Sequence, residues 1–212
     1  ELGSWNDELI AQAAEANLVL VPLDRCYSPE SYPTLDAIRE LNPDAAIVGY
    51  HGLLAAATLR PDTAYLRAQI PYDLDYWNAV RDDWAYTTTG DTFMIWNDVV
   101  FLNPIKNGGL NLDLIDDIVG LVERYQDESG HPVDGVLHDY FMYDPYMNPA
   151  MADRVDGEAD FDGDGVGYYD DEDEQALFML WQKEYARAFR SRLGDEFIQI
   201  ANGRPPQEDA DL

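Results

Sequence analysis

The sequence predicts an α/β fold in which repeated β-α units are arranged around a parallel sheet. Short apolar runs rich in β-branched residues alternate with segments of helical period along most of the 212 residues. The hydrophobic fraction of 46% is typical of a globular chain, and we expect one domain over residues 1–212. No apolar run reaches the roughly eighteen residues that a membrane span needs, so no membrane insertion is expected.

Five apolar runs are the expected strands of this sheet. They are Leu18–Leu23, Ala46–Tyr50, Phe93–Trp96, Val136–Phe141 and Phe197–Ala201. Four segments with apolar residues at helical spacing are the expected helices. They are Glu8–Ala16, Thr34–Leu41, Leu112–Tyr125 and Glu172–Leu193. Asn111 precedes the third helix and is its expected N-cap, because a side-chain oxygen there can accept a hydrogen bond from an unpaired amide of the first turn.

The charge of the chain is strongly negative. A formal net charge of -29 comes from 42 acidic and 13 basic residues, which excludes nucleic acid as a partner because that needs a basic surface. So many carboxylates suit a protein that stays soluble in strong salt, and an ordinary acidic secreted protein is the alternative. The chain begins at Glu1 rather than Met, and we expect a mature secreted product, or a trimmed chain, with an extracellular location.

The segment Asp160–Asp171 has the spacing of a calcium-binding loop. Carboxylates stand at loop positions 1, 3, 5 and 12, and Gly165 stands at position 6, where such a loop turns sharply. The expected ligands are the side chains of Asp160, Asp162, Asp164 and Asp171 and the backbone carbonyl of Val166. A solvated acidic loop is the alternative in so acidic a chain. We expect Ca2+ here, in a structural role.

Asp139 is the leading candidate for a catalytic residue. It lies near the end of an expected strand, where a carboxylate is held rigidly and can act as nucleophile or general acid. An Asp that caps the following loop is the alternative. Asp24 and Asp98 follow the first and third expected strands, and either could supply the second carboxyl group that glycoside hydrolysis needs. A loop cap or a sugar ligand is the alternative for each of them.

Aromatic residues gather near the same strand ends. Trp77, Trp96 and Tyr140 could pack their flat faces against sugar rings, although core packing explains Trp96 equally well. His138 precedes the candidate carboxylate, and no spacing of His, Cys and Glu indicates a zinc site. We therefore expect His138 to form hydrogen bonds to a substrate rather than to bind a metal.

Several short segments together resemble a known family. They are Leu41–Ala45 leading into Ile47–Tyr50, the strand Asp134–Asp139, the Asp-rich loop, and Leu193–Asp195 leading to Ile200–Gly203. In this order they resemble glycoside hydrolases of (β/α)8-barrel type, the TIM-barrel fold, related to the endo-α-1,4-polygalactosaminidase group. The resemblance implies cleavage of an extracellular polysaccharide, with Asp139 matching the acidic residue after the fourth strand. We expect Asn202, at the end of the last strand, to contact this glycan.

The resemblance also exposes a departure from the family. Such barrels have about 250 residues and continue past the position of Asn202, so we expect a barrel that is incomplete at its C-terminus, with about five strands. An open parallel edge needs a cover, and we expect self-association or a further C-terminal segment to provide it. Two functions stay open at this point. One is a secreted hydrolase with paired carboxylates, and the other is a non-catalytic calcium-stabilised module that binds glycan or builds a surface layer or filament.

Overall fold

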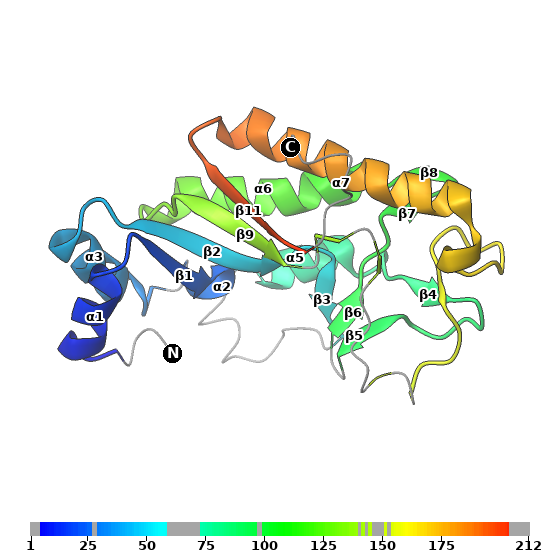
Figure 1. The fold of residues 1–212 in the computed structure, drawn as a ribbon, viewed down its shortest axis with the longest axis horizontal. Helices are drawn as coiled ribbons and strands as arrows, with labels where there is room; N and C mark the ends of the chain where they lie inside the picture. The colour runs from blue at the N-terminus through cyan, green and yellow to red at the C-terminus, as the bar shows by residue number, and fades with distance from the viewer. Residues whose placement is uncertain are drawn as a thin grey trace.

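A parallel sheet of four strands is the central element of the protein (Figure 1). The structure is a computed structural model, and it describes residues 5–26, 29–58, 73–96, 99–139, 141–142, 144–145, 151 and 154–203. The four strands are β1 (Leu18–Pro22), β2 (Ala46–Gly52), β9 (Gly135–Asp139) and β11 (Ile198–Asn202). They lie in the order β1-β2-β9-β11, which is their order along the chain, and every pair is parallel. Four of the five expected strands are thus confirmed, with ends shifted by one or two residues.

The third expected strand, Phe93–Trp96, was wrongly placed in the parallel sheet. Its residues form β5 (Met94–Trp96), which pairs antiparallel with β6 (Val99–Phe101) in a separate small sheet. The physical reason is the short connection between β5 and β6. Only two residues separate β5 from β6, which suffices for an antiparallel hairpin, whereas a parallel pair needs a crossover of a dozen or more. The described residues therefore form a mixed α/β fold with a four-stranded parallel sheet and no closed barrel.

The helices connect and cover the strands. Their bounds are α1 (Asp7–Ala14), α2 (Leu23–Cys26), α3 (Tyr32–Leu41), α5 (Asp73–Val80), α6 (Leu112–Ser129), α7 (Glu172–Leu193) and the short 3-10 helix η3 (Tyr168–Asp170). The predicted bounds of α7 are confirmed, and the Asn111 side chain caps α6 by accepting a hydrogen bond from the Leu114 amide. Helix α6 runs four residues past the predicted end and stops at Gly130, whose φ of 69° suits glycine. Among the described residues, no helix is long and apolar enough to cross a membrane.

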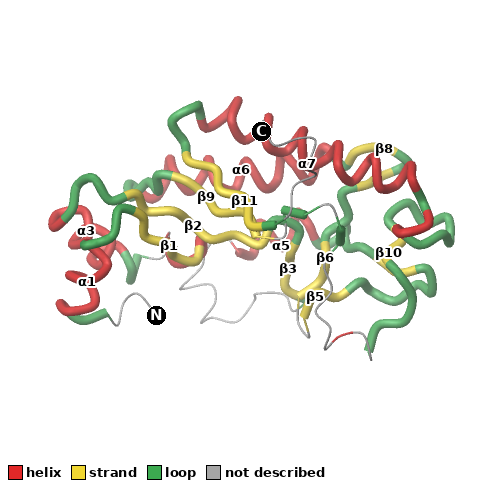
Figure 2. The backbone as a smooth tube through the Cα atoms, viewed as in Figure 1, coloured by secondary structure: helices red, strands yellow, loops and turns green. Residues whose placement is uncertain are grey.

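Short strands build the part of the molecule next to the sheet (Figure 2). They are β3 (Ala55–Ala57), β4 (Tyr86–Thr87), β7 (Ile105–Lys106), β8 (Gly109–Leu110) and β10 (Ala159–Asp160), in addition to β5 and β6. The sheet orders are β3-β6-β5, β10-β4 and β7-β8, and all of these pairs are antiparallel. The pairing of β10 with β4 holds the start of the acidic loop beside the segment that contains Tyr86.

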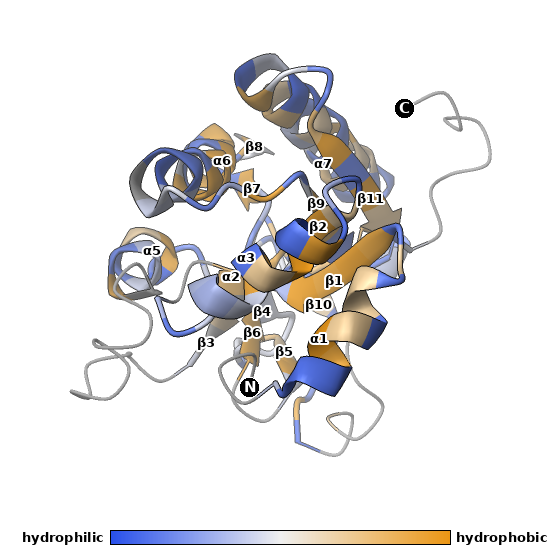
Figure 3. Ribbon diagram, turned by 90° about the vertical axis from the view of Figure 1, so that its left-hand side faces the viewer, coloured by the Kyte–Doolittle hydropathy of each residue, from blue (hydrophilic) through white to orange (hydrophobic). Residues whose placement is uncertain are grey.

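The two faces of the parallel sheet differ in how far they are covered. The side chains of Val21, Ile47 and Val136 are buried, and helices α6 and α7 lie together on one side of the sheet in Figure 3. Side chains alternate along a strand, so the neighbours of these residues point to the opposite face. There Leu18 is 39% exposed and Leu20 is 48% exposed. This face is thus partly apolar and less fully covered, although Val48 on it is buried, and it carries the strand-end residues described next.

Helix α7 supplies much of the core on the covered face. Phe178, Trp181, Tyr185 and Phe189 follow one another at spacings of three or four residues, and each is fully buried. The indole of Trp181 stacks on the ring of Tyr185 and donates a hydrogen bond of 2.8 Å to the carbonyl oxygen of Asn111. This bond ties α7 to the beginning of α6, so the two long helices pack as a pair behind the sheet.

Candidate functional site

Three polar side chains meet at the carboxyl edge of the parallel sheet. The Tyr50 hydroxyl donates a hydrogen bond to Oδ2 of Asp139, and Nδ2 of Asn202 donates one of 2.8 Å to Oδ1. The Asp139 side chain is only partly exposed. Each oxygen of this carboxylate therefore has a donor, and the orientation of the carboxyl group is fixed by residues from the two flanking strands.

The strand register explains why these residues meet. Asp139 is level with Gly52 of β2 and with Asn202 of β11, and Tyr50 lies two residues before Gly52. Because side chains alternate with a period of two, Tyr50, Asp139 and Asn202 point to the same face of the sheet. The Leu53 amide also donates a 3.0 Å hydrogen bond to the Asp139 carbonyl oxygen, which anchors the backbone at the strand end.

The arrangement at this edge suits recognition of a polar ligand. Asp139 can accept hydrogen bonds from hydroxyl groups, and Asn202 can donate and accept them. The Tyr50 side chain is 39% exposed and offers part of an aromatic face to solvent. Sequence reasoning predicted Asp139 and Asn202 but missed Tyr50. Its position at the end of a predicted strand was the available signal.

His138, expected to contact substrate, points to the opposite face of the sheet. Its side chain is 2% exposed, its Nδ1 lies 3.2 Å from the Tyr185 hydroxyl oxygen, and its ring centroid is 4.9 Å from that of Phe189. Burial and the neighbouring His51 lower the pKa of His138 to about 3, and burial lowers the pKa of His51 to about 4. Both imidazoles are therefore neutral near pH 7. Substrate contact by His138 would require this packing to open, and that role stays a prediction.

The remaining predicted site residues are dispersed or undescribed. Asp24 lies in α2 directly after β1, but its side chain is outside what the structure describes, and Asp98 and Tyr140 lie outside the described residues altogether. Trp77 belongs to α5, where the guanidinium of Arg81 lies 5.9 Å from its ring centroid. Trp96 belongs to β5 in the small antiparallel sheet and is 44% exposed. Their roles in catalysis or substrate binding stay predictions.

The acidic loop turns sharply at Gly165, as its spacing predicts. Asp160 accepts hydrogen bonds from the Gly163 amide at 2.7 Å and from the Gly165 amide at 3.0 Å, one with each carboxylate oxygen. The φ angles of these two glycines are 79° and 88°, a region that side-chain-bearing residues rarely adopt. Asp162 in turn accepts from the Asp164 amide at 3.1 Å. The chain therefore folds back on itself and gathers its carboxylates on one side.

A buried glutamate joins this loop from helix α7. Glu174 is 1% exposed, and its Oε1 accepts hydrogen bonds from the Phe161 amide and, at 3.0 Å, from the Asp162 amide. Burial raises the pKa of Glu174 to about 7, an effect that these amides oppose and that the charges of Asp162 and Asp160 reinforce. Sequence reasoning did not single out this residue. A signal was present, because Glu174 stands three positions after the N-cap Asp171, as in a capping box.

The carboxylates form two overlapping groups. In one, oxygens of Asp160, Asp162 and Glu174 lie within 4.8 Å of one another, and in the other, those of Asp162, Asp164 and Asp171 do so. Asp171 also accepts a 3.0 Å hydrogen bond from the Glu174 amide as the N-cap of α7. Of the four predicted aspartate ligands, Asp162, Asp164 and Asp171 thus share one group, whereas Asp160 joins only Asp162 and Glu174. The role of the Val166 carbonyl stays a prediction.

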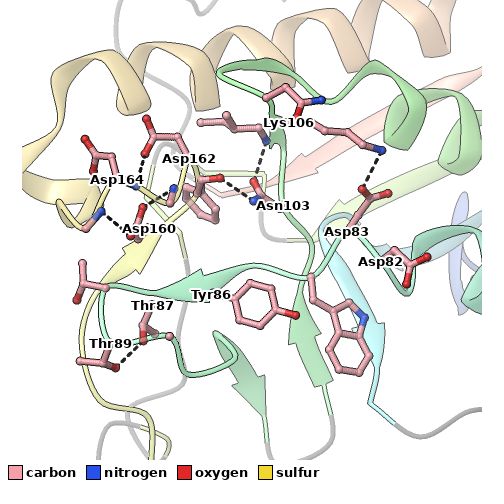
Figure 4. Close-up of a pocket in the computed structure, with 18 residues that line it drawn as sticks. Asp82, Asp83, Tyr86, Thr87, Thr89, Asn103, Lys106, Asp160, Asp162 and Asp164 are labelled. Atoms are coloured by element: carbon pink, nitrogen blue, oxygen red, sulfur yellow. Dashed lines mark hydrogen bonds and ion pairs between the residues drawn. The ribbon is translucent and has the colours of Figure 1, made fainter.

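An open cavity of about 680 Å³ lies beside the acidic loop (Figure 4). The loop residues Asp160–Gly165 line one side, and Tyr86–Gly90 and Lys106 line others. The Lys106 ammonium lies 3.2 Å from a carboxylate oxygen of Asp83, so the one lysine in the lining is already engaged by an acid. The cavity is therefore strongly acidic, and it gives the loop carboxylates direct access to solvent.

Comparisons with known proteins do not place the chain in a family. No family model matches it, and no curated protein matches it. The two places where function can be sought are therefore defined by their geometry alone. They are the carboxyl edge of the parallel sheet around Asp139 and the acidic loop with its adjoining cavity.

Proposed function

We propose that the chain is a glycoside hydrolase-like protein that binds an extracellular polysaccharide at the carboxyl edge of its parallel sheet. The observation that carries this proposal is the Asp139 carboxylate, held between Tyr50 and Asn202 at the ends of three adjacent strands. Active sites of β/α folds gather at this edge because the strand ends point their side chains toward a common opening. Asp139 is the proposed catalytic carboxylate, and the other two side chains orient it.

The finer fold in this proposal is an arc of a (β/α)8 barrel. Four parallel strands in chain order, with helices on one side, match such an arc, whereas doubly wound sheets reverse their strand order. The face that carries Leu20 and Tyr50 would then point to the barrel interior. Closure would require further strands beside β1 or β11, supplied by another copy or by additional chain.

The chemistry of the edge suits a sugar. A pyranose presents hydroxyl groups at its rim and C–H bonds on its faces, so it needs polar partners beside an aromatic surface. Asp139 and Asn202 provide the polar partners, and the half-exposed ring of Tyr50 provides the aromatic surface. Glycoside hydrolysis also needs a second carboxyl group, about 5 to 9.5 Å from the first depending on the stereochemical outcome. Asp24 and Asp98 remain the proposed sources of that group.

A non-catalytic glycan-binding module is the second candidate function. It is favoured by one observation, namely that both oxygens of Asp139 already accept hydrogen bonds from protein side chains. Such a carboxylate is well suited to fix the position of a ligand. A nucleophile would have to keep one of these oxygens available to attack a sugar carbon.

A screen of polysaccharides for both binding and release of reducing ends tests the proposal. We expect the wild-type chain to release reducing ends from at least one polymer, and Asp139→Asn to slow this release by about 100-fold or more, the usual effect of losing an acid-base group. Asp127→Asn is the matched control, because Asp127 is exposed on α6. It should retain the wild-type rate. Equal rates for Asp139→Asn and wild type would exclude Asp139 as the catalytic residue.

Binding measured in parallel separates the two candidate functions. A hydrolase predicts that Asp139→Asn still binds the polymer that the wild type cleaves. A non-catalytic module predicts binding without release of reducing ends by any variant, and weaker binding by Asp139→Asn and Tyr50→Phe. If no polysaccharide binds to the wild-type chain, both functions are excluded for the polymers screened.

A further inference from the structure

Glu174 has an unusual environment for a carboxylate. Its side chain is 1% exposed, and its Oε1 accepts hydrogen bonds from the Phe161 and Asp162 amides. The second oxygen, Oε2, is buried and has no hydrogen-bond partner among the described residues. A buried carboxylate oxygen without a donor is unfavourable, so a positively charged or donating group is expected next to it.

The surroundings of Glu174 are acidic rather than basic. Carboxylate oxygens of Glu174, Asp160 and Asp162 lie within 4.8 Å of one another, and Asp160 is itself buried. Like charges at this separation repel, and no described ion pair links any of the three to a basic side chain. A cation held among the three carboxylates would relieve the repulsion and would give the buried carboxyl group of Glu174 a positively charged neighbour.

We propose that one divalent cation of the calcium type binds among Asp160, Asp162 and Glu174, with Glu174 as its deepest ligand. Three hard, anionic oxygen donors favour Ca2+ over softer metals, which prefer sulfur or imidazole. Amide hydrogen bonds already hold Asp160 and Glu174 in place, and lone pairs remain for a metal on both Asp160 carboxylate oxygens and on Oε2 of Glu174. The site is thus largely preformed.

The cavity beside the loop provides the entry path. Asp160 and Asp162 line it, so a hydrated ion can reach them from solvent and complete its coordination with water from that side. Glu174 approaches from α7 behind the loop. The ion would therefore connect the first turn of this long helix to β10 and to the Asp-rich turn, in addition to the Glu174 hydrogen bonds and the packing of Phe161 against Phe178.

This ligand set differs from the one that the spacing of the loop predicts. In that set, Asp171 at position 12 closes the site, together with Asp164. In the structure, Asp171 caps α7, and the residue that reaches back into the loop is Glu174, three positions later. The proposed site therefore uses a helix residue outside Asp160–Asp171, and substitutions distinguish the two sets.

Calcium titration of the chelator-treated chain by calorimetry, with melting curves beside it, tests the proposal. We expect one Ca2+ per chain and a higher melting temperature with Ca2+, because a ligand that binds only the folded state raises its stability. Glu174→Gln keeps an oxygen for the two amides but removes the charge, and it should weaken binding by about tenfold or more. Glu172→Gln, at an exposed position in the same helical turn, is the matched control and should bind as the wild type does.

Two further variants complete the comparison of the ligand sets. Asp160 belongs to both sets, so Asp160→Asn should lose about tenfold or more in affinity under either one, and it tests Ca2+ binding by the loop if Glu174→Gln does not fold. Asp171→Asn keeps an N-cap side chain and should lose less than about threefold. Loss of binding in Asp171→Asn with unchanged binding in Glu174→Gln would overturn the proposal. Absence of Ca2+ binding to the wild-type chain would also overturn it.

Discussion

Asn111 connects the start of α6 with the Asn103 backbone and with Trp181 of α7. The loss of stability on its replacement can be worked out from these contacts. Oδ1 accepts a hydrogen bond from the Leu114 amide at 3.3 Å, and Nδ2 donates one of 3.0 Å to the carbonyl oxygen of Asn103. The bond from Trp181 goes to the backbone oxygen and survives any substitution. Asn111→Ala therefore removes a helix cap, worth about 1 kcal/mol. It also leaves a carbonyl without its donor in a part-buried setting, at a cost of about 1–3 kcal/mol.

Together these losses predict that Asn111→Ala lowers the free energy of unfolding by about 3 kcal/mol and the melting temperature by roughly 6–12 °C. Urea unfolding followed by tryptophan fluorescence measures the change. Asn111→Ser retains a capping oxygen and should lose about 2 kcal/mol. Asn78→Ala, at an exposed position of α5, should stay within about 0.5 kcal/mol of the wild type. A loss below about 0.5 kcal/mol in Asn111→Ala would refute this reasoning.

Two other predictions concern the histidines of the parallel sheet and the close packing of its strands. His51 and His138 have lowered pKa values, so below about pH 6.5 the unfolded chain binds protons that the folded chain does not. The stability advantage of wild type over His51→Gln should shrink by about 3 kcal/mol between pH 6.5 and 4, and a constant difference in urea unfolding would contradict this. In Gly135→Ala, a Cβ would lie 2.3 Å from the Ile198 carbonyl oxygen and should cost at least about 2 kcal/mol, whereas Gly120→Ala in α6 should be neutral or stabilising. Equal effects of the two glycine substitutions on thermal unfolding would refute the packing argument.

The repeated units of the fold could be predicted because each carries a local signal. The apolar run Ala46–Tyr50 has the composition of a buried strand. The helix after Asn111 has apolar residues at helical spacing and a capping residue at its start. The run at Phe93–Trp96 has the same composition, but the strand with which it pairs decides which sheet it joins. The antiparallel partner β6 begins after only two residues, and apolar periodicity alone does not distinguish a parallel strand from an arm of a hairpin.

For single residues of the candidate sites, too, the sequence predicts position along an element better than it predicts tertiary contacts. The positions of Asp139 and Asn202 at strand ends could be predicted, because polar residues interrupt the apolar runs there. Tyr50 was missed because a tyrosine at a strand end usually packs. Glu174 was missed because burial of a glutamate depends on how α7 meets the loop, and only tertiary contacts determine that. His138 was expected to contact a substrate, but it lies one residue before Asp139 on the same strand. Because side chains alternate along a strand, that shift of one position turns the His138 side chain to the covered face.

Hydrogen–deuterium exchange with and without a polysaccharide that binds the chain tests the location of the functional site most directly. The proposed function predicts that the bound glycan slows exchange of backbone amides near Tyr50, Asp139 and Asn202, at the carboxyl edge of the parallel sheet. Amides of Asp160–Asp171 should be unaffected by glycan when Ca2+ is held constant. Protection confined to that loop, or to any region away from the sheet edge, would contradict the assignment of the glycan site to Asp139.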